Sequence, residues 1–434
     1  MSDCINDLSM DIATPRNVFF SGFYKRSFAY SDIKKRLPRI LTELTDLLVA
    51  HKGKIIEDYG LDARDELEIV IGEISKLKCE IETNKPMRNI MDDASDAALY
   101  NSYLAEQMNT TYFTSVSLFA ACYAYRRIRE IFNLTQSLCG YDPFKILKEE
   151  AHLTSRTAMV ELSRYLISIF GKNSENNEQE FNKLLKLNLW GNKCDLSFSA
   201  GVVENACNPA NNLEVNIISN QSSEIWSAVT DSNSPIIDIV LDNTGYELFT
   251  DLCLADFFIT KKLAQKIRIY VKSIPWFVSD VTKSDFDWTL QELMKSDVSE
   301  LNKLGKRWSK YVQDGIWVVV DNKFFTLPID YSYMAKEGVD LYKQFAEAKL
   351  VIFKGDLNYR KLFGEKNWNP RTSLEDGLQG FMPSKLAILR TIKCQLVCGL
   401  EAGIAEAISE KFPDWEESGN YGVIQFCDKI KVVT

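Results

Sequence analysis

The second half of the chain contains short, nearly continuous apolar runs that alternate with helical patterns. The clearest run covers residues 236–241, is rich in Ile and Val, and is followed by a glycine and a helical pattern over 248–258. Three further apolar runs and one further helical stretch cover 267–271, 316–320, 350–353 and 339–348. Strands buried on both faces that alternate with helices predict a mostly parallel sheet with helices on both sides. We therefore predict an α/β fold.

The first half of the chain has helical periodicity instead. Apolar residues recur on one helical face over 31–50, 67–77, 115–132, 155–170 and 178–187. From about 201 the sequence turns to Asn, Ser and Gly, which is typical of a connecting segment. We predict the following organisation: a flexible tail over 1–23, a helical N-terminal subdomain over 24–200, a connecting region over 201–235 and an α/β domain over 236–434.

The composition disfavours several classes of partner. The chain has 51 Lys and Arg against 60 Asp and Glu, a formal net charge of −9, so it lacks the positive field that binds nucleic acid through phosphate neutralisation. No apolar stretch approaches the ~20 residues of a membrane span, and the first residues do not resemble a signal peptide. We expect no nucleic-acid or membrane partner, and a cytoplasmic location that can extend to the nucleus.

Histidine and cysteine usage restricts the chemistry. The chain has only two histidines, His51 and His152, and its ten cysteines include no Cys-x-x-Cys pair. Zinc sites of the His/Cys type, Ser-His-Asp triads and disulfide frameworks are therefore disfavoured. Carboxylates, amides, Lys and Arg remain to do the chemistry, and these groups suit a hard metal ion.

Polar residues follow two of the predicted strands directly. Asp242 and Asn243 come after the run at 236–241, and Asp280 follows the next predicted strand. Ligands of open parallel sheets bind beyond the carboxyl ends of the strands, and Asp and Asn oxygens are natural ligands for Mg²⁺ or Mn²⁺. The same residues also fit ordinary helix caps or Asx turns, so both interpretations stay open at this point.

A third polar segment, 353–360, follows the predicted strand at 350–353. It contains two cations, Lys354 and Arg360, together with Asp356 and a glycine. Such a turn can hold a phosphate through backbone N–H groups and a guanidinium, although many basic turns are only solvated. Lys393 can supply a further positive charge at the sheet edge.

Two common phosphate chemistries do not fit the spacing. An aspartyl-phosphate mechanism of the haloacid dehalogenase type needs a second acid two residues after the first, where this chain has Thr244. No Gly-x-Gly-x-x-Gly motif follows any predicted strand, so the dinucleotide-binding fingerprint is missing as well.

Four motifs in this order, 240–248, 274–280, 354–362 and 390–393, resemble the metal-dependent damage-control phosphatase family. The most similar branch is the eukaryotic one that is also called sugar phosphate phosphatase or acidic residue methyltransferase. Segments 27–30, 125–128 and 189–197 are similar too, so the resemblance extends from about residue 24 to about residue 428. It implies a Rossmann-like α/β/α domain with a mostly parallel sheet, preceded by a helical N-terminal part.

The resemblance also implies roles for individual residues. Asp242, Asn243 and Asp280 would be catalytic and would bind one divalent metal, namely Mn²⁺, Ni²⁺, Co²⁺ or Mg²⁺. Glu247 and Asp280 would contact S-adenosyl-L-methionine if the family's methyltransferase activity applies. The substrate-binding residues would be Asp242, Asn243, Asp356, Leu357, Asn358, Tyr359, Arg360 and Lys393.

The function implied is hydrolysis of sugar phosphate monoesters such as fructose 1-phosphate, in the clearance of damaging metabolites. The partner would then be a small phosphorylated metabolite. The alternative is an S-adenosylmethionine-dependent protein-glutamate O-methyltransferase, which alone would require a protein substrate. A third interpretation is a non-catalytic scaffold, which the presence of every motif residue disfavours.

Overall fold

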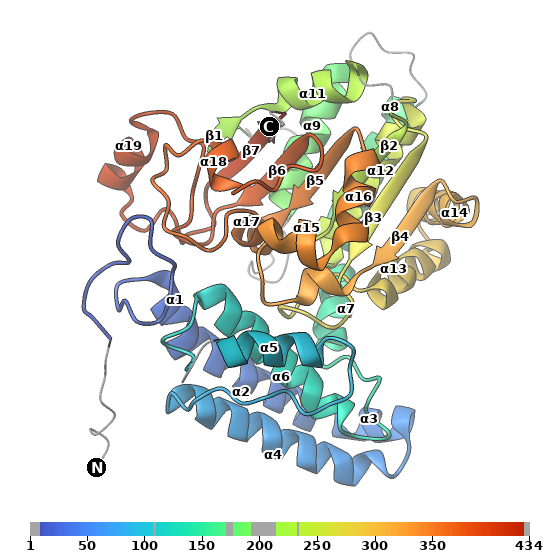
Figure 1. Cartoon of the computed structure of the whole chain (residues 1–434). Helices are drawn as coiled ribbons and strands as arrows, with labels where there is room; N and C mark the ends of the chain where they lie inside the picture. Colours follow the sequence, from blue (N-terminus) through green and yellow to red (C-terminus); the bar gives the residue numbers. More distant parts are fainter. Residues whose placement is uncertain (1–8, 107–109, 171–176, 192–213, 232–233, 429–434) are drawn as a thin grey trace. The chain divides into compact units, whose positions relative to one another are not determined.

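The computed structural model describes residues 9–106, 110–170, 177–191, 214–231 and 234–428. Its contacts divide the chain into two compact units (Figure 1). The helical unit comprises 1–144 with the short segments 326–329 and 365–368, and the sheet unit comprises the rest of the chain. The helices predicted over 155–170 and 178–187 thus belong to the sheet unit, although the sequence grouped them with the N-terminal helices.

The helical unit contains a π-helical turn and six helices in its described residues. The elements are α1 (Phe28–Ser31), η1 (Asp32–Arg36), α2 (Leu37–Ala50), α3 (Lys52–Tyr59), α4 (Ala63–Glu82), α5 (Ala97–Glu106) and α6 (Ser117–Asn133). Helices α2 and α4 are amphipathic, and each buries the apolar face that the sequence predicted against the other.

The segment predicted as a flexible tail over 1–23 differs from the structure beyond residue 8. The Phe20 side chain is fully buried, and its backbone N–H donates to the carbonyl of Glu365 at 2.9 Å. Met10 forms a bridge with Tyr24. The lack of periodicity in this segment therefore reflects an irregular backbone that packs against the unit. Residues 1–8 lie outside the described residues.

The sheet unit contains seven strands in its described residues. They are β1 (Ile217–Asn220), β2 (Ile236–Val240), β3 (Lys266–Val271), β4 (Trp317–Asp321), β5 (Leu350–Lys354), β6 (Leu386–Thr391) and β7 (Gly422–Cys427). Their order in the sheet is β1-β7-β6-β5-β2-β3-β4, and every neighbouring pair is parallel except β6 and β7. The predicted α/β class with a mostly parallel sheet is confirmed.

Helices and short helical turns connect these strands. They are α7 (Lys145–Thr154), α8 (Arg156–Phe170), α9 (Asn177–Trp190), α11 (Ser222–Asp231), α12 (Gly245–Thr260), α13 (Lys283–Lys295), α14 (Ser299–Gln313), η3 (Lys323–Thr326), η4 (Tyr331–Tyr333), α15 (Met334–Glu337), α16 (Val339–Glu347), α17 (Gly355–Leu362), α18 (Leu374–Gly377) and α19 (Ile404–Lys411). Strand β1 and helix α11 lie in the segment predicted as a connecting region, whose residues 201–213 and 232–233 fall outside the described part.

The two faces of the sheet carry different side chains and different helices (Figure 1). On one face, Ile237 and Ile239 join a large apolar cluster with α8, α9 and the almost completely buried α12. On the other face, Tyr270 packs on Phe345 of α16. Helices α8 and α9 thus bury their apolar stripes on α12, and this packing explains why they belong to the sheet unit.

The strand directions bring several segments to one edge of the sheet. Strands β2, β3, β5 and β6 are parallel, so their carboxyl ends share this edge, which we call the carboxyl edge. Strand β7 is antiparallel to β6, and β1 is parallel to β7, so the amino ends of β7 and β1 lie at the same edge. No helix among the described residues is long and apolar enough to cross a membrane.

Candidate active site

The segments that follow β2 and β3 are joined by backbone hydrogen bonds. Asn243 and Asp280 form a bridge, the Thr244 N–H donates to Ser279 at 2.8 Å, and the Val281 N–H donates to Asp242 at 2.9 Å. The turn before Asp280 contains Phe277 and Val278 at φ of 44° and 72°, which are uncommon angles for residues other than glycine. The structure thus brings Asp242, Asn243 and Asp280 together at the carboxyl edge.

The amide of Asn243 connects two of the acids. Its Nδ2 donates to Asp242 Oδ2 at 2.8 Å and to Glu247 Oε2 at 2.9 Å, while its Oδ1 accepts a hydrogen bond from the Ser279 hydroxyl at 2.5 Å. The amide therefore presents its positive edge to the space between the carboxylates. A 180° rotation of the amide would present its oxygen there instead, as metal ligation requires.

A buried lysine supports Asp280. Lys272 Nζ lies 3.2 Å from Asp280 Oδ2 and donates to the Leu241 carbonyl at 3.0 Å. Burial raises the pKa of Asp280 to about 6 even though Lys272 opposes the shift. Burial and the neighbouring carboxylates of Asp280 and Glu247 raise the pKa of Asp242 well above its ordinary value. Asp242 is thus the carboxylate of this site that most needs a positive partner.

A second buried lysine lies beneath Glu247. Lys354 Nζ, at the end of β5, lies 3.1 Å from Glu247 Oε1 and 3.0 Å from Asp251 Oδ1, and it donates to the Asn188 carbonyl at 3.2 Å. Asn188 in turn donates to Asp251 at 2.6 Å. The sequence analysis counted Lys354 among the cations of a phosphate-binding turn, but the structure places it in this internal network and away from solvent.

Helix α17 begins against Asp242. Gly355, its first residue, has φ of +81°, and a Cβ built on it would lie 1.8 Å from Asp242 Oδ2. The cap residue Lys354 gives α17 no side-chain hydrogen bond. The first N–H groups of a helix lack partners within the helix and attract anions. The glycine therefore lets these N–H groups approach the acids of β2 closely.

The four side chains from Asp356 to Tyr359 divide between the site and the core. Asp356 is partly exposed, and Arg390 Nε donates to its Oδ1 at 2.8 Å. Leu357 is buried. Asn358 Nδ2 donates to the carbonyls of Leu241 and Lys354 at 3.2 and 2.8 Å, and the Tyr359 hydroxyl accepts from the Cys398 N–H at 3.0 Å. Of these four, only Asp356 offers a side chain, whereas the others can offer backbone groups.

Cations surround Asp356. Burial would raise its pKa, but the charges of Arg390, Arg360 and Lys393 outweigh burial and hold the pKa below its ordinary value. Arg390 is fully buried and stacks on the Tyr359 ring at 4.0 Å, whereas Lys393 is exposed. Asp356 is therefore an ionised acid that can accept a hydrogen bond.

The residues present fit a divalent cation by their chemistry and charge. Among the described residues, no three His, Cys, Asp or Glu side chains form a ready metal cluster. Four buried acids nevertheless lie close together with two buried lysines, as the following list gives: Asp242, Glu247, Asp251, Asp280, Lys272 and Lys354. With all four acids ionised, two negative charges remain uncompensated, and one divalent cation would balance them.

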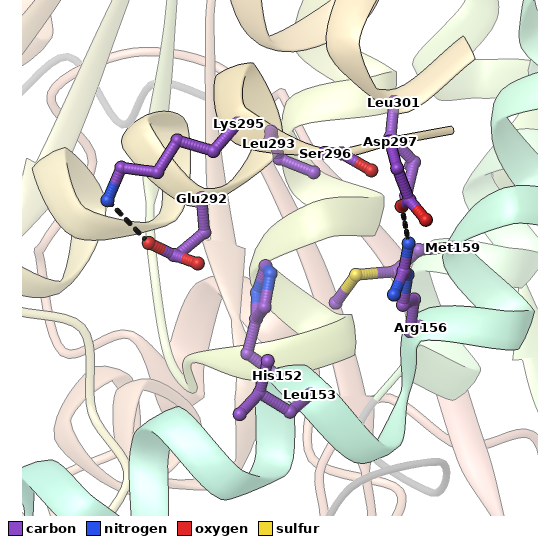
Figure 2. A pocket seen from close by; sticks show the side chains of 10 residues that line it. All are labelled: His152, Leu153, Arg156, Met159, Glu292, Leu293, Lys295, Ser296, Asp297 and Leu301. Carbon is purple, nitrogen blue, oxygen red and sulfur yellow. Dashed lines mark hydrogen bonds and ion pairs between the residues drawn. The ribbon is translucent and has the colours of Figure 1, made fainter. Parts of the chain in front are cut away.

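A separate pocket of about 270 Å³ in the sheet unit contains none of the predicted site residues (Figure 2). Figure 2 shows the His152 ring between two ion pairs, Arg156 with Asp297 and Lys295 with Glu292. Burial lowers the pKa of His152 to about 4. We therefore assign the chemistry to the carboxyl edge rather than to this pocket.

Comparison with known proteins decides the family. The damage-control phosphatase ARMT1-like domain matches residues 33–408. Damage-control phosphatase ARMT1 of Mus musculus is 38% identical over 429 residues, which cover 94% of this chain and 98% of the relative. The chain belongs to the ARMT1-like damage-control phosphatase family. The proteins of the same name from Danio rerio and Homo sapiens are 37% and 36% identical, with 94% and 92% of this chain covered and 96% of each relative. The predicted family is confirmed.

Three supporting residues of this family member were missed by the sequence analysis. Lys272 and Arg390 hold Asp280 and Asp356, and Gly355 allows α17 to approach Asp242. A charged residue within or directly after an apolar strand is the available signal for the first two, because an ion there must be paired. The contact of Gly355 has no signal in the sequence beyond the glycine itself.

Proposed function

We propose that this chain is a metal-dependent phosphatase that hydrolyses sugar phosphate monoesters such as fructose 1-phosphate. Membership of the damage-control phosphatase family supports phosphatase activity. The observation that carries the finer proposal is the meeting of Asp242, Asn243 and Asp280 beside the start of α17. Hard oxygen ligands and an anion-binding helix start are the two parts that phosphate ester hydrolysis at a metal requires.

The proposed metal is Mn²⁺, Ni²⁺, Co²⁺ or Mg²⁺, held by Asp242, Asn243 and Asp280. When bound, such a cation supplies a Lewis acid for a phosphoryl oxygen and lowers the pKa of a bound water. Lys272 keeps Asp280 in place, and the Ser279 hydroxyl, which now donates to Asn243 Oδ1, fixes the orientation of that amide. The two buried lysines leave room for a single divalent charge.

The remaining residues bind and orient the ester. The N–H groups at the start of α17 donate to phosphate oxygens, and Arg360 and Lys393 stabilise the negative charge on them. Asp356, which Arg390 holds by a hydrogen bond of 2.8 Å, accepts a hydrogen bond from a substrate hydroxyl. Asn358 and Tyr359 act from the core by fixing the start of α17 to β2 and to the Cys398 segment.

The test is phosphate release from a panel of sugar phosphates by metal-free protein, with each of the four metals added in turn. We expect release only with metal, and a loss of roughly 1,000-fold or more in Asp242→Asn and Asp280→Asn, because the cation supplies several kcal/mol of transition-state stabilisation. The matched control is Asp287→Asn, which removes an exposed carboxylate of α13 that pairs only with Lys283 in the described structure. Release without metal, or unchanged rates in both site variants, would contradict the proposal.

The methyltransferase alternative remains a prediction. It assigns Glu247 and Asp280 to S-adenosyl-L-methionine, but Glu247 Oε1 lies 3.1 Å from the buried Lys354, an arrangement equally suited to a structural role. Incubation of the same preparation with labelled S-adenosyl-L-methionine and an acidic protein measures it separately. Methyl incorporation that Asp280→Asn abolishes, without phosphate release from any ester, would favour the alternative.

A further inference from the structure

A second pocket of about 440 Å³ in the sheet unit lies between α19 and the start of β7. Its lining combines aromatic rings with hydrogen-bonding side chains: Asn216, Lys411, Phe412, Pro413, Asp414, Trp415, Ser418, Asn420 and Tyr421. The volume is within the range of about 300–1,000 Å³ that is usual for small-molecule sites. None of these residues belongs to the site described above.

The sheet topology places this pocket at the carboxyl edge. Asn216 directly precedes β1 and Tyr421 directly precedes β7, and the amino ends of both strands lie at the edge where β5 and β6 end. In the row of strands, β6 follows β5 and β7 follows β6. The metal-ligand candidates, the start of α17, Lys393 and the pocket thus succeed one another along one edge. In Figure 1, β1, β7 and α19 lie together at the end of the sheet opposite to β4.

Lys393 links the pocket to the phosphate-binding residues. The Ile392 N–H donates to the Tyr421 carbonyl at 2.8 Å, and the Gly419 N–H donates to the Ile392 carbonyl at 3.0 Å. A Cβ built on Gly419 would lie 3.8 Å from Lys393 Cγ, so the lysine stem runs along the turn that lines the pocket. The charge of Lys393 also acts on Asp242 and Asp356. Lys393 therefore lies between the two regions.

The pocket lining indicates which part of a substrate it can hold. Tyr421 lies between two rings, with centroids 5.8 Å from Trp415 and 6.4 Å from Phe412. Trp415 is buried and Phe412 is 56% exposed, so Phe412 offers an aromatic surface to a ligand. The amide of Asn216 and the carboxylate of Asp414 can exchange hydrogen bonds with hydroxyl groups. Aromatic surface together with such groups suits a polyhydroxylated carbon skeleton.

We infer that this pocket binds the polyhydroxylated organic part of the phosphate ester and so selects sugar phosphates over shorter esters. The inference rests on the proposed function, because it places the phosphate at α17 and the carbon skeleton on the far side of Lys393. Phe412, Asn216 and Asp414 are then specificity-determining residues that contact no reacting atom.

The experiment compares kcat/KM for fructose 1-phosphate and for glycerol 3-phosphate in the wild-type protein, Phe412→Ala and Asn216→Ala. We expect the ratio of the two values to fall roughly tenfold in each variant, as is usual for the loss of one contact in a specificity pocket. The control is Tyr333→Ala, which removes a 45% exposed ring of η4 in the same unit and should leave the ratio unchanged. Equal losses for the two esters in the pocket variants would overturn the inference while the phosphatase proposal stands.

A binding measurement keeps the inference testable without turnover. Saturation-transfer NMR with free fructose should detect contact with the wild-type protein, and Phe412→Ala should abolish most of that signal. If no ester is hydrolysed with any metal but this pattern is seen, the proposed function fails and the sugar-binding pocket remains. If free fructose gives no signal, or gives the same signal with Phe412→Ala, the pocket does not bind the carbon skeleton.

Discussion

Gly355 and Asp242 are in such close contact that a Cβ on the glycine would lie 1.8 Å from the carboxylate Oδ2. They come from the adjacent parallel strands β5 and β2. The left-handed φ of +81° at Gly355 turns the chain from β5 into α17 at this point. The contact joins the two halves of the proposed site, the metal-binding acids and the phosphate-binding helix start.

Replacing Gly355 by alanine should therefore disrupt the site. We expect Gly355→Ala to lose at least about 100-fold in kcat/KM for the preferred sugar phosphate, because a displacement of about 1 Å at a reacting centre has this effect. The matched control is Gly380→Ala, whose glycine has φ of +90° with nothing within 4 Å of an added Cβ. It introduces the same backbone strain, so similar losses of activity in both variants would show that the Asp242 contact is not the cause.

Lys354 should be essential for the stability of the sheet unit. Lys354→Met leaves the buried acids Glu247 and Asp251 without their cation, so the free energy of unfolding should fall by roughly 3–5 kcal/mol, as for other broken buried ion pairs. Urea unfolding followed by circular dichroism measures it, and Asp251→Asn added to Lys354→Met should recover part of the loss.

The control for this prediction is Lys310→Met. Lys310 pairs with Asp314 at the surface, with side chains 71% and 44% exposed, and such pairs contribute about 1 kcal/mol or less. If Lys354→Met were no more destabilising than Lys310→Met, the network beneath Glu247 would not be a stabilising ion cluster.

His152 should make folding stability depend on pH. Its ring lies 5.1 Å from that of Trp288, its Nδ1 has no hydrogen-bond partner among the described residues, and burial lowers its pKa to about 4. The unfolded chain binds a proton near pH 6.5 while the folded chain does not, so stability is present above that pH and is lost as the pH falls. The loss should reach about 2 kcal/mol at pH 5.

Unfolding by urea at pH 8 and pH 5 measures this effect. His152→Gln should show a pH difference smaller by that amount, whereas His51→Gln, which changes the other histidine of the chain, should not. An identical pH difference in the wild-type protein and in His152→Gln would show that acids, and not this imidazole, cause the dependence.

The strands that the sequence predicted are those of the sheet centre, and β4 beside them, because their apolar runs are unbroken. Strands β1 and β7 were not predicted. Strand β7 includes Gly422 and the buried Gln425, which break the apolar pattern, and β1 has only four residues. The pairing of β7 against β6, which reverses its direction, depends on tertiary contacts that no local pattern contains.

Domain boundaries were harder to predict for a physical reason. Periodicity shows that α8 and α9 are amphipathic, but it does not show which surface buries their apolar faces. Phe181 of α9 packs on Phe257 and Phe258 of α12, more than seventy residues away in the sequence. Only the folded structure reveals that these helices belong with the sheet.

The positions of the site residues could be predicted in part. Polar residues after parallel strands must share one edge, which is why Asp242 and Asp280 could be placed together in advance. The internal roles of Lys354 and Asn358 could not, because the sequence does not show whether a polar side chain next to a turn points to solvent or into the core. Their hydrogen bonds to Glu247 and Leu241 answer this.

The most direct test of the account is Mn²⁺ binding to the metal-free protein, measured by electron paramagnetic resonance. We predict one bound ion per chain in the wild-type protein, and an affinity at least about 100-fold lower in Asp242→Asn and in Asp280→Asn, since even outer groups of a metal site contribute 10–100-fold. Asp287→Asn should bind as the wild-type protein does. Equal Mn²⁺ affinity in the wild-type protein and both site variants, or no bound ion at all, would contradict the proposal that these two acids hold a catalytic metal.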